Sequence, residues 1–257
     1  MKRILVISDL HCGHTSGLTH PGFDPDRPPK RKQSLWKMRR GIWGWFDKTV
    51  HSLGNIHAVI VNGDAIDGRG EKSGGTELLA ADRNEQVEMA AAAIMHIPCK
   101  TRMLAYGTPY HAGQLEDWED AVAAQVHAEK IGGEDTVDVD GVLINYRHHI
   151  GRSGIPHGRH TAVAKEALWN ALWNERGEYP RAHIILRSHV HYVSYAGGAD
   201  WVGITTPALQ GYGGKYGTRI MSGTVDIGMI VIDVIGKGEF VWKPLIFRLP
   251  MHKPISL

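Results

Sequence analysis

Five short clusters of aspartate, glycine and histidine are spaced along this chain, and each follows an apolar run. The clusters are Asp9-Leu10-His11, Gly63-Asp64, residues 107–111, His148-His149 and His189-Val190-His191. Carboxylates and imidazoles that follow adjacent strands converge in space, as ligands do at the strand ends of open α/β sheets. Oxygen and nitrogen donors together suit divalent ions such as Mn, Fe or Zn. The spacing therefore predicts a metal site.

The elements that must position these clusters are predicted from the apolar runs. Strands are expected over residues 4–8, 58–62, 103–106, 142–147 and 184–186, each ending at one cluster. Helices are expected over 34–53, 76–96, 114–131 and 161–175, with Ser34 and Thr76 as N-caps. A hairpin turns at Asp140-Gly141, and two more strands cover 225–234 and 239–247. Because no linker or internal repeat is visible, we expect one mixed α/β domain over residues 1–257.

Size and composition are those of an ordinary globular protein. The chain has 257 residues, of which 42% are hydrophobic and 22% charged, and its net charge of +2 does not demand nucleic acid or a membrane. Two cysteines, Cys12 and Cys99, argue against a disulfide framework and fit a reducing compartment. The N-terminal apolar run is too short for a signal sequence, and no window approaches a membrane span. We therefore expect a cytoplasmic protein with no membrane partner.

The spacing within the clusters suits shared ions. Asp9 and His11 are two residues apart, as are His189 and His191, so each pair can direct both side chains toward one ion. Asp64 has two carboxylate oxygens and could bridge two ions. Taken singly, an Asp-x-His pair is usually structural or solvated, and a Gly-Asp after a strand is usually a turn. The prediction depends on all five clusters occurring in order at strand ends.

These motifs resemble those of the calcineurin-like metallophosphoesterases. The segments Ser8-Asp9-Leu10-His11, Asn62-Gly63-Asp64, His148 and Ser188-His189-Val190-His191 follow that family's order, and the resemblance spans residues 4 to about 247. It implies a four-layer α/β/β/α sandwich of two mixed β-sheets flanked by helices. It also implies a dinuclear centre, with Asp9, His11, Asp64 and His191 around one ion and Asp64, His148 and His189 around the other. His148 is preferred to His149 because it is the first histidine after the strand.

The third motif departs from the family's Gly-Asn-His followed by an acid. Here Thr108 stands in place of the asparagine ligand, and its hydroxyl is a poorer donor to a metal than an amide oxygen. The histidine, His111, is displaced by two residues. We expect it to act as the general acid near the leaving group; the alternatives are that it takes the vacant metal position or is a bystander. This motif style is similar to phosphoesterases encoded by phages, whose location would be the host-cell cytoplasm.

The resemblance implies a dinuclear metal-dependent phosphoesterase. Two divalent ions, Mn²⁺ foremost with Fe, Zn, Ni or Mg as alternatives, would clamp the phosphoryl group while a metal-bridging hydroxide attacks phosphorus. We expect a phosphodiester substrate, in DNA or RNA. The alternatives are a phosphomonoesterase, a cyclic-nucleotide phosphodiesterase, or a catalytically inactive scaffold that retains the fold. Arg147 and Arg187 adjoin the histidine motifs and are expected to bind phosphate oxygens.

Two weaker signals concern nucleic acid. A basic run over residues 27–40, which includes Trp36, could follow a phosphate backbone, although a solvated face is the alternative. Tyr212 and Tyr216 lie in a glycine-rich segment and could stack on a base or only anchor a loop. The sequence does not predict the oligomeric state.

Overall fold

Two β-sheets form the centre of the computed structural model, which describes residues 1–25, 30, 33–212, 223–236 and 238–250. The first sheet has six strands in the order β11-β10-β1-β2-β3-β4, and the second has five in the order β5-β6-β7-β9-β8. The strands of the first sheet are β1 (Lys2–Ile7), β2 (Ala58–Asn62), β3 (Thr101–Ala105), β4 (Lys130–Gly132), β10 (Ile227–Gly236) and β11 (Glu239–Phe247). Those of the second are β5 (Glu134–Val139), β6 (Val142–Arg147), β7 (Ile184–Arg187), β8 (Ser194–Gly197) and β9 (Val202–Thr205).

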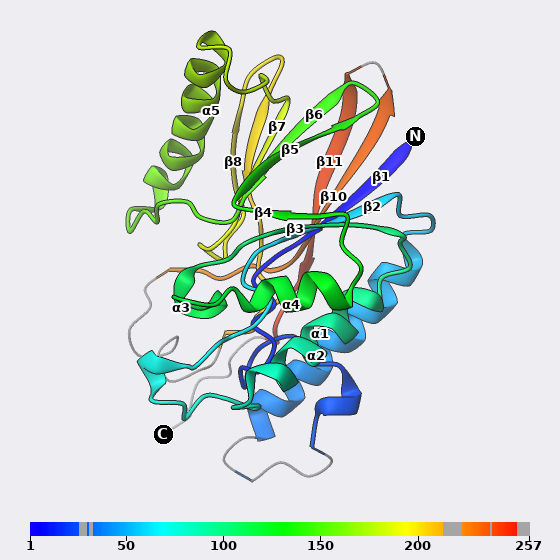
Figure 1. Ribbon diagram of the computed structural model, residues 1–257, viewed down its shortest axis with the longest axis vertical. Coiled ribbons are helices and arrows are strands. Elements are labelled where there is room, and N and C mark those ends of the chain that lie inside the picture. The colour runs from blue at the N-terminus through cyan, green and yellow to red at the C-terminus, as the bar shows by residue number, and fades with distance from the viewer. Residues whose placement is uncertain (26–29, 31–32, 213–222, 237, 251–257) are drawn as a thin grey trace.

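Helices cover the outer faces of both sheets (Figure 1). They are α1 (Gln33–Ser52), α2 (Arg83–Met95), the short α3 (Pro109–Ala112), α4 (Trp118–Gln125) and α5 (Arg159–Glu175). The alternation along β1 shows the layers, since Ile4 and Val6 pack toward the second sheet while Leu5 and Ile7 pack toward α1 and α2. The four-layer sandwich of two mixed sheets flanked by helices is therefore confirmed.

The topology brings many strand ends to one edge. Strands β1 to β4 are parallel in the first sheet, and β6, β7 and β9 are parallel in the second. Buried hydrogen bonds join the two sheets at that edge: Asn62 Nδ2 donates to Ser188 Oγ at 2.7 Å, and the hydroxyls of Ser188 and Ser8 each lie 2.7 Å from that of Thr206. Ser188 is therefore one of the residues that hold the sheets together.

Several element boundaries differ from those expected. Helix α2 begins at Arg83 with Asp82 as its N-cap. Residues 76–82 were expected to be its first turns, but their backbone bonds to the loop after β1, since the N–H groups of Leu79 and Ala80 both donate to Gly13 O. The region 114–131 is helical only in α4 and then enters β4. The short strands β8 and β9 were not predicted, whereas the hairpin β5–β6 and the pair β10–β11 are confirmed.

The basic run contributes less exposed charge than expected. Arg39 is buried and pairs with Asp24, and Arg40 pairs with the same carboxylate at 3.1 Å while lying over the Trp36 ring. Lys30 and Lys37 of that run are exposed, whereas residues 26–29 and 31–32, and Tyr216, lie outside the described residues. Among the described helices, none has the length and apolarity to cross a membrane.

Candidate metal centre

The backbone is unusual where the clusters meet. Seven described non-glycine residues have positive φ, and five of them come from the predicted clusters: Asp9, His11, Asp64, His189 and His191, with φ between 45° and 70°. This left-handed conformation is unfavourable for residues with a Cβ and is typical of functional sites, where surrounding structure enforces it. Backbone bonds enforce it here, since the N–H of Asp9 donates to Gly63 O and that of His11 to Asp64 O, both at 3.0 Å.

Three overlapping groups of side chains could each hold an ion. They are Asp9 with His11 and His191, His11 with Asp64 and His111, and Asp64 with His148 and His189; within each group the ligand atoms lie within 4.8 Å of one another. The structure thus brings together every predicted aspartate and histidine ligand, and Asp64 lies in two groups, as a bridging carboxylate would. His148 is buried and directed into the cluster, whereas His149 is exposed and lies beside the His189 ring.

The imidazoles are oriented by hydrogen bonds on their far sides. Nδ1 of His148 donates to Asn62 O at 2.7 Å, and Nδ1 of His111 donates to Asp67 O at 2.7 Å. Nδ1 of His11 lies 3.2 Å from the Asp67 carboxylate, so Asp67 orients this imidazole. Since carbonyl and carboxylate oxygens only accept, the proton sits on Nδ1, and each Nε2 lone pair is left for the centre.

Buried polar atoms without partners show that a cation fits. Asp9 Oδ1 and His148 Nε2 are buried and meet no hydrogen-bond geometry within the described part of the chain, although His148 Nε2 forms an ion pair with Asp64 Oδ2 at 3.1 Å. Asp9 Oδ1 nevertheless lies 3.1 Å from Nε2 of His191 and 4.0 Å from Nε2 of both His11 and His148. Burying an ionised oxygen without a hydrogen-bond donor lowers the stability of the folded protein. Oxygen and imidazole donors converging on one point match the ligand preferences of divalent transition metals.

Electrostatics set the protonation of these groups. Burial lowers the pKa of His11 well below its usual range, and it lowers that of His189 to about 4 with help from the charge of His148. Burial alone would raise the pKa of Asp9, but His191 and His148 outweigh it and bring that pKa to about 2. For His148, burial opposes the charged form, yet the Asp64 carboxylate raises its pKa to about 10. Without metal, a proton on His148 therefore balances the carboxylates.

Two glycines are required by close packing around Asp64 and His148. A Cβ on Gly107 would lie 2.1 Å from Asp64 Oδ1, and a Cβ on Gly63 would lie 2.5 Å from His148 Nδ1. Both contacts are with groups whose positions the hydrogen bonds fix, so neither side chain can move aside. At Gly63, the absence of a side chain lets the backbone lie against the His148 ring.

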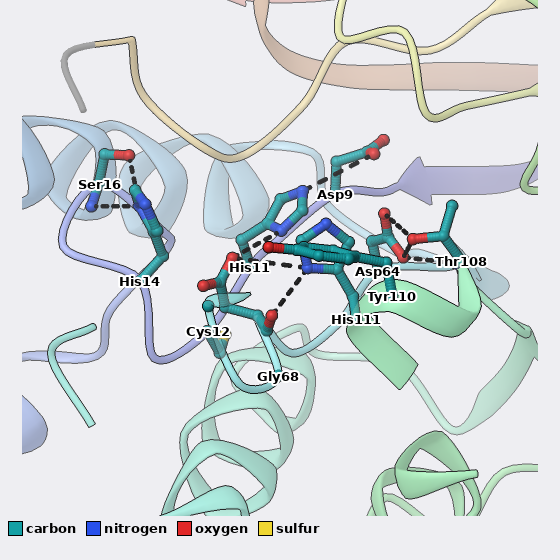
Figure 2. A network of polar contacts seen from close by, with 12 residues as sticks. Asp9, His11, Cys12, His14, Ser16, Asp64, Gly68, Thr108, Tyr110 and His111 are labelled. Atoms are coloured by element: carbon teal, nitrogen blue, oxygen red, sulfur yellow. Dashed lines mark hydrogen bonds and ion pairs between the residues drawn. The ribbon is translucent and has the colours of Figure 1, made fainter. Parts of the chain in front are cut away.

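The third motif supports Asp64 and brings His111 to the cluster. Thr108 caps α3, and its N–H donates to Asp64 Oδ1 at 2.7 Å while its hydroxyl lies 3.2 Å from the same oxygen. Figure 2 shows His11, His111 and Asp64 directed toward one space, with the Tyr110 ring beside His111. Thr108 thus orients the carboxylate, and His111 lies close enough to serve either as a ligand or as a proton carrier.

Glu119 is a supporting residue that sequence reasoning missed. This buried side chain of α4 accepts hydrogen bonds from the N–H of Ala65, at 2.8 Å, and of Gly107. It therefore ties the loop after β2 to the loop after β3. Burial, and then the charge of Asp64, raise the pKa of Glu119 to about 7. No motif in the sequence singled it out, so nothing in the residue pattern predicted this role.

The predicted substrate arginines lie outside the centre. Arg187 is buried, and its guanidinium contacts Glu166, Glu134 and Asn145 on the side of the sheet that faces α5. Arg147 contacts the same two glutamates, at 2.6 and 2.9 Å. The expectation that these two side chains bind phosphate is therefore not supported, because carboxylates already use their donors.

A cleft opens beside the centre. It has a volume of about 240 Å³, and one part of its wall is formed by His11, Asp64, His111, His189 and His191. The remainder includes Tyr110 of the third motif, together with Lys72 and Arg152 from loops that the motifs do not cover. Lys72 lies over the Tyr110 ring, and its backbone N–H donates to the Tyr110 hydroxyl at 2.6 Å. Basic and aromatic groups therefore adjoin the candidate ligands.

Comparison with known proteins adds similarity of structure only. No protein-family model matches the chain, and no curated protein matches it. A single mutant of Vps29 from Entamoeba histolytica is 11% identical, with 96% of this chain and 99% of that chain covered and a TM-score of 0.46. An archaeal phosphodiesterase is 13% identical, with 95% and 99% covered and a TM-score of 0.46. Wild-type Vps29 from Entamoeba histolytica complexed with Zn²⁺ is 11% identical, with 96% and 99% covered and a TM-score of 0.43. Because these identities and TM-scores are low, the chemistry has to be inferred from the site itself.

Proposed function

We propose that this protein is a divalent-metal-dependent phosphoesterase. The observation that carries the proposal is Asp9 Oδ1, a buried carboxylate oxygen that accepts no hydrogen bond in the described part of the chain although three imidazole nitrogens lie within 4.0 Å. A buried anion stays ionised only with a compensating charge, and a metal ion supplies one while using the Nε2 lone pairs.

We assign two ions to the centre. Asp9, His11, Asp64 and His191 would hold one, and Asp64, His148 and His189 would hold the other. The support is that the ligand atoms of these residues gather in overlapping groups joined by Asp64. Thr108, predicted as a ligand of the second ion, donates to Asp64 and so contributes at least by orienting the shared carboxylate. Mn²⁺ is the ion we expect first.

The residues of the chain have distinct tasks in hydrolysis. When bound, the ions would activate a water molecule and offset the negative charge on the phosphoryl oxygens. His111 keeps a proton on Nδ1 through its bond to Asp67 O, so Nε2 is the atom that can carry a second proton and release it to a leaving oxygen. Glu119 holds the loops that carry Asp64 and Thr108 in register.

The substrate we propose is a phosphodiester, with DNA or RNA foremost. The support is the cleft, where Lys72 and Arg152 place cationic side chains near the ligands and suit phosphates that flank the scissile one. A phosphomonoester or a cyclic nucleotide would fit the same centre with fewer contacts to these cations. An inactive scaffold would use neither the centre for catalysis nor the cations for substrate binding. These alternatives make different predictions for catalysis.

Hydrolysis of two model substrates tests the proposal. The protein is stripped of metal and then assayed on bis-p-nitrophenyl phosphate and p-nitrophenyl phosphate with and without Mn²⁺, while bound metal is counted. We expect Mn²⁺-dependent turnover that is faster on the diester. Faster turnover of the monoester would favour the phosphomonoesterase, and bound metal without turnover of either compound or of DNA would favour the scaffold.

A variant of the shared carboxylate tests the ligand assignment. Asp64→Asn keeps the size of the side chain but removes the charge that both ions would share, so we expect it to lose metal occupancy and hydrolysis together. His149→Gln is the matched control, because His149 is exposed beside the centre. Full activity of Asp64→Asn with both ions bound would contradict the assignment.

A further inference from the structure

A second cluster of histidine and aspartate lies on the helical layer, away from the strand ends. Asp47 and His51 are one helical turn apart on α1, and His96 is the C-cap residue of α2. One ligand atom from each of these residues lies within 4.8 Å of the other two. Neither the candidate centre nor the cleft uses any of them, so the cluster needs an explanation of its own.

Its donor atoms lie close enough to share one ion after local rotation of the imidazoles. Asp47 Oδ1 lies 2.7 Å from His96 Nε2, and it lies 3.4 Å from His51 Nδ1, which donates to the Asp47 backbone oxygen at 2.9 Å. Ligand atoms bound about 2.0–2.1 Å from a tetrahedral ion are roughly 3.4 Å apart, so the His51 distance already fits an ion and the His96 distance, which is that of a hydrogen bond, has to lengthen. The His51 and His96 rings lie 5.0 Å apart, edge to face, and small side-chain movements would bring the nitrogens around one point.

The local field also favours a cation. His51 is in the last turn of α1, and His96 follows the last residue of α2. The C-terminus of a helix carries partial negative charge, so two such ends and one carboxylate meet at this cluster. The three side chains are only partly covered, which leaves room for water to complete the coordination of a bound ion.

We propose that Asp47, His51 and His96 form a separate binding site for one Zn²⁺ ion, which fastens the end of α1 to the end of α2. Two imidazoles and one carboxylate suit Zn²⁺ better than Mn²⁺ or Mg²⁺, which prefer oxygen-rich sites. Three protein ligands leave the fourth tetrahedral position to water. Because an ion that binds only the folded protein stabilises it, Zn²⁺ should raise the melting temperature through this site.

The test counts ions in the full-length protein. Wild type and His51→Ala/His96→Ala are stripped of metal, titrated with Zn²⁺ by calorimetry, and analysed for bound metal and melting temperature. We expect the double variant to bind about one Zn²⁺ fewer. The Zn²⁺ affinity of this site should fall by more than roughly 10–100-fold, which is the loss expected when a residue only supports a ligand. The matched control is His57→Ala/His127→Ala, which removes two exposed histidines elsewhere.

The outcomes separate this site from the candidate centre. If the double variant binds as many Zn²⁺ ions as wild type with the same affinities and melting-temperature gain, the proposal is wrong, and Asp47 only hydrogen-bonds to two imidazoles. If wild type binds a single Zn²⁺ that the double variant loses, this site is supported while the dinuclear centre is not. Asp47→Asn, which preserves the shape of the helix surface, gives a second reading, and melting in chelator confirms that each variant folds.

Discussion

Metal binding at the proposed centre should release a proton from His148. In the metal-free protein the pKa of this imidazole is raised to about 10, because the effect of the Asp64 carboxylate, 3.1 Å away, exceeds that of burial. To bind an ion, His148 Nε2 has to give up that proton, since Nδ1 is held by Asn62 O. Metal affinity is therefore coupled to pH through one identifiable group.

The magnitude follows from the distance between the working pH and that pKa. With a pKa of about 10, nearly all of His148 is protonated at pH 8, and displacing the proton weakens binding of the second ion about 100-fold, or about 3 kcal/mol. The apparent affinity should rise about tenfold per pH unit up to about pH 10. Asp9, with a pKa of about 2, and His189, with a pKa of about 4, release nothing at pH 8.

Calorimetry in buffers with different ionisation enthalpies measures the released protons directly. We expect about one proton per second-site ion at pH 8, and a smaller value above pH 10. His149→Gln should behave as wild type because its side chain is exposed. His148→Gln should bind any remaining ion without this release. A wild-type affinity that is flat between pH 7 and pH 9, with no proton released, would refute the argument that Asp64 keeps His148 charged.

Three further predictions concern the same residues. Because the pKa of His148 is raised from 6.5 to about 10 in the folded state, its stabilisation of the metal-free protein is complete below about pH 6.5 and is lost as the pH rises through 10; melting in chelator should show this fall, and His148→Gln should flatten it. Glu119→Ala leaves the buried N–H groups of Ala65 and Gly107 without acceptors, so denaturant unfolding should show a loss of about 1–3 kcal/mol for each group, together with weaker metal binding. His111→Ala should lower kcat about 10²–10⁴-fold with both ions retained, whereas loss of one ion in metal analysis would make His111 a ligand.

The fold and the grouping of the aspartates and histidines could be predicted because they depend on chain order. Apolar runs that end in polar clusters identify buried strands, and parallel strands end at the same edge. Nothing comparable identifies Glu119, which accepts a hydrogen bond from the N–H of Ala65 although 54 positions separate the two residues in the chain. The left-handed backbone conformation of Asp9 and His11 could not be predicted either, since neither residue type by itself indicates a positive φ.

The alternation of residues along the strands could have predicted the positions of Arg147 and Arg187. Ile144 and Tyr146 pack between the two sheets, so alternation along β6 directs Arg147 to the opposite face. The same parity, with Ile184 and Leu186 inside, directs Arg187 toward α5. A side chain on the face toward α5 cannot reach the strand-end centre, although the next residue in the chain can, as His148 does after Arg147. Proximity in sequence to a ligand is therefore a weaker guide than the face of the strand.

The centre is held in place by bonds that do not involve a metal ion. Asn62 joins the two sheets through Ser188 and orients His148 through its carbonyl oxygen, and Asp67 orients both His11 and His111. These donors and acceptors belong to the fold, so the Nε2 atoms are directed at the centre before any ion arrives. An ion then has little structure to rearrange, and its main competitor is the proton on His148. In the proposed metal centre, the way the two sheets are joined would therefore make pH, and not folding, the control on metal occupancy.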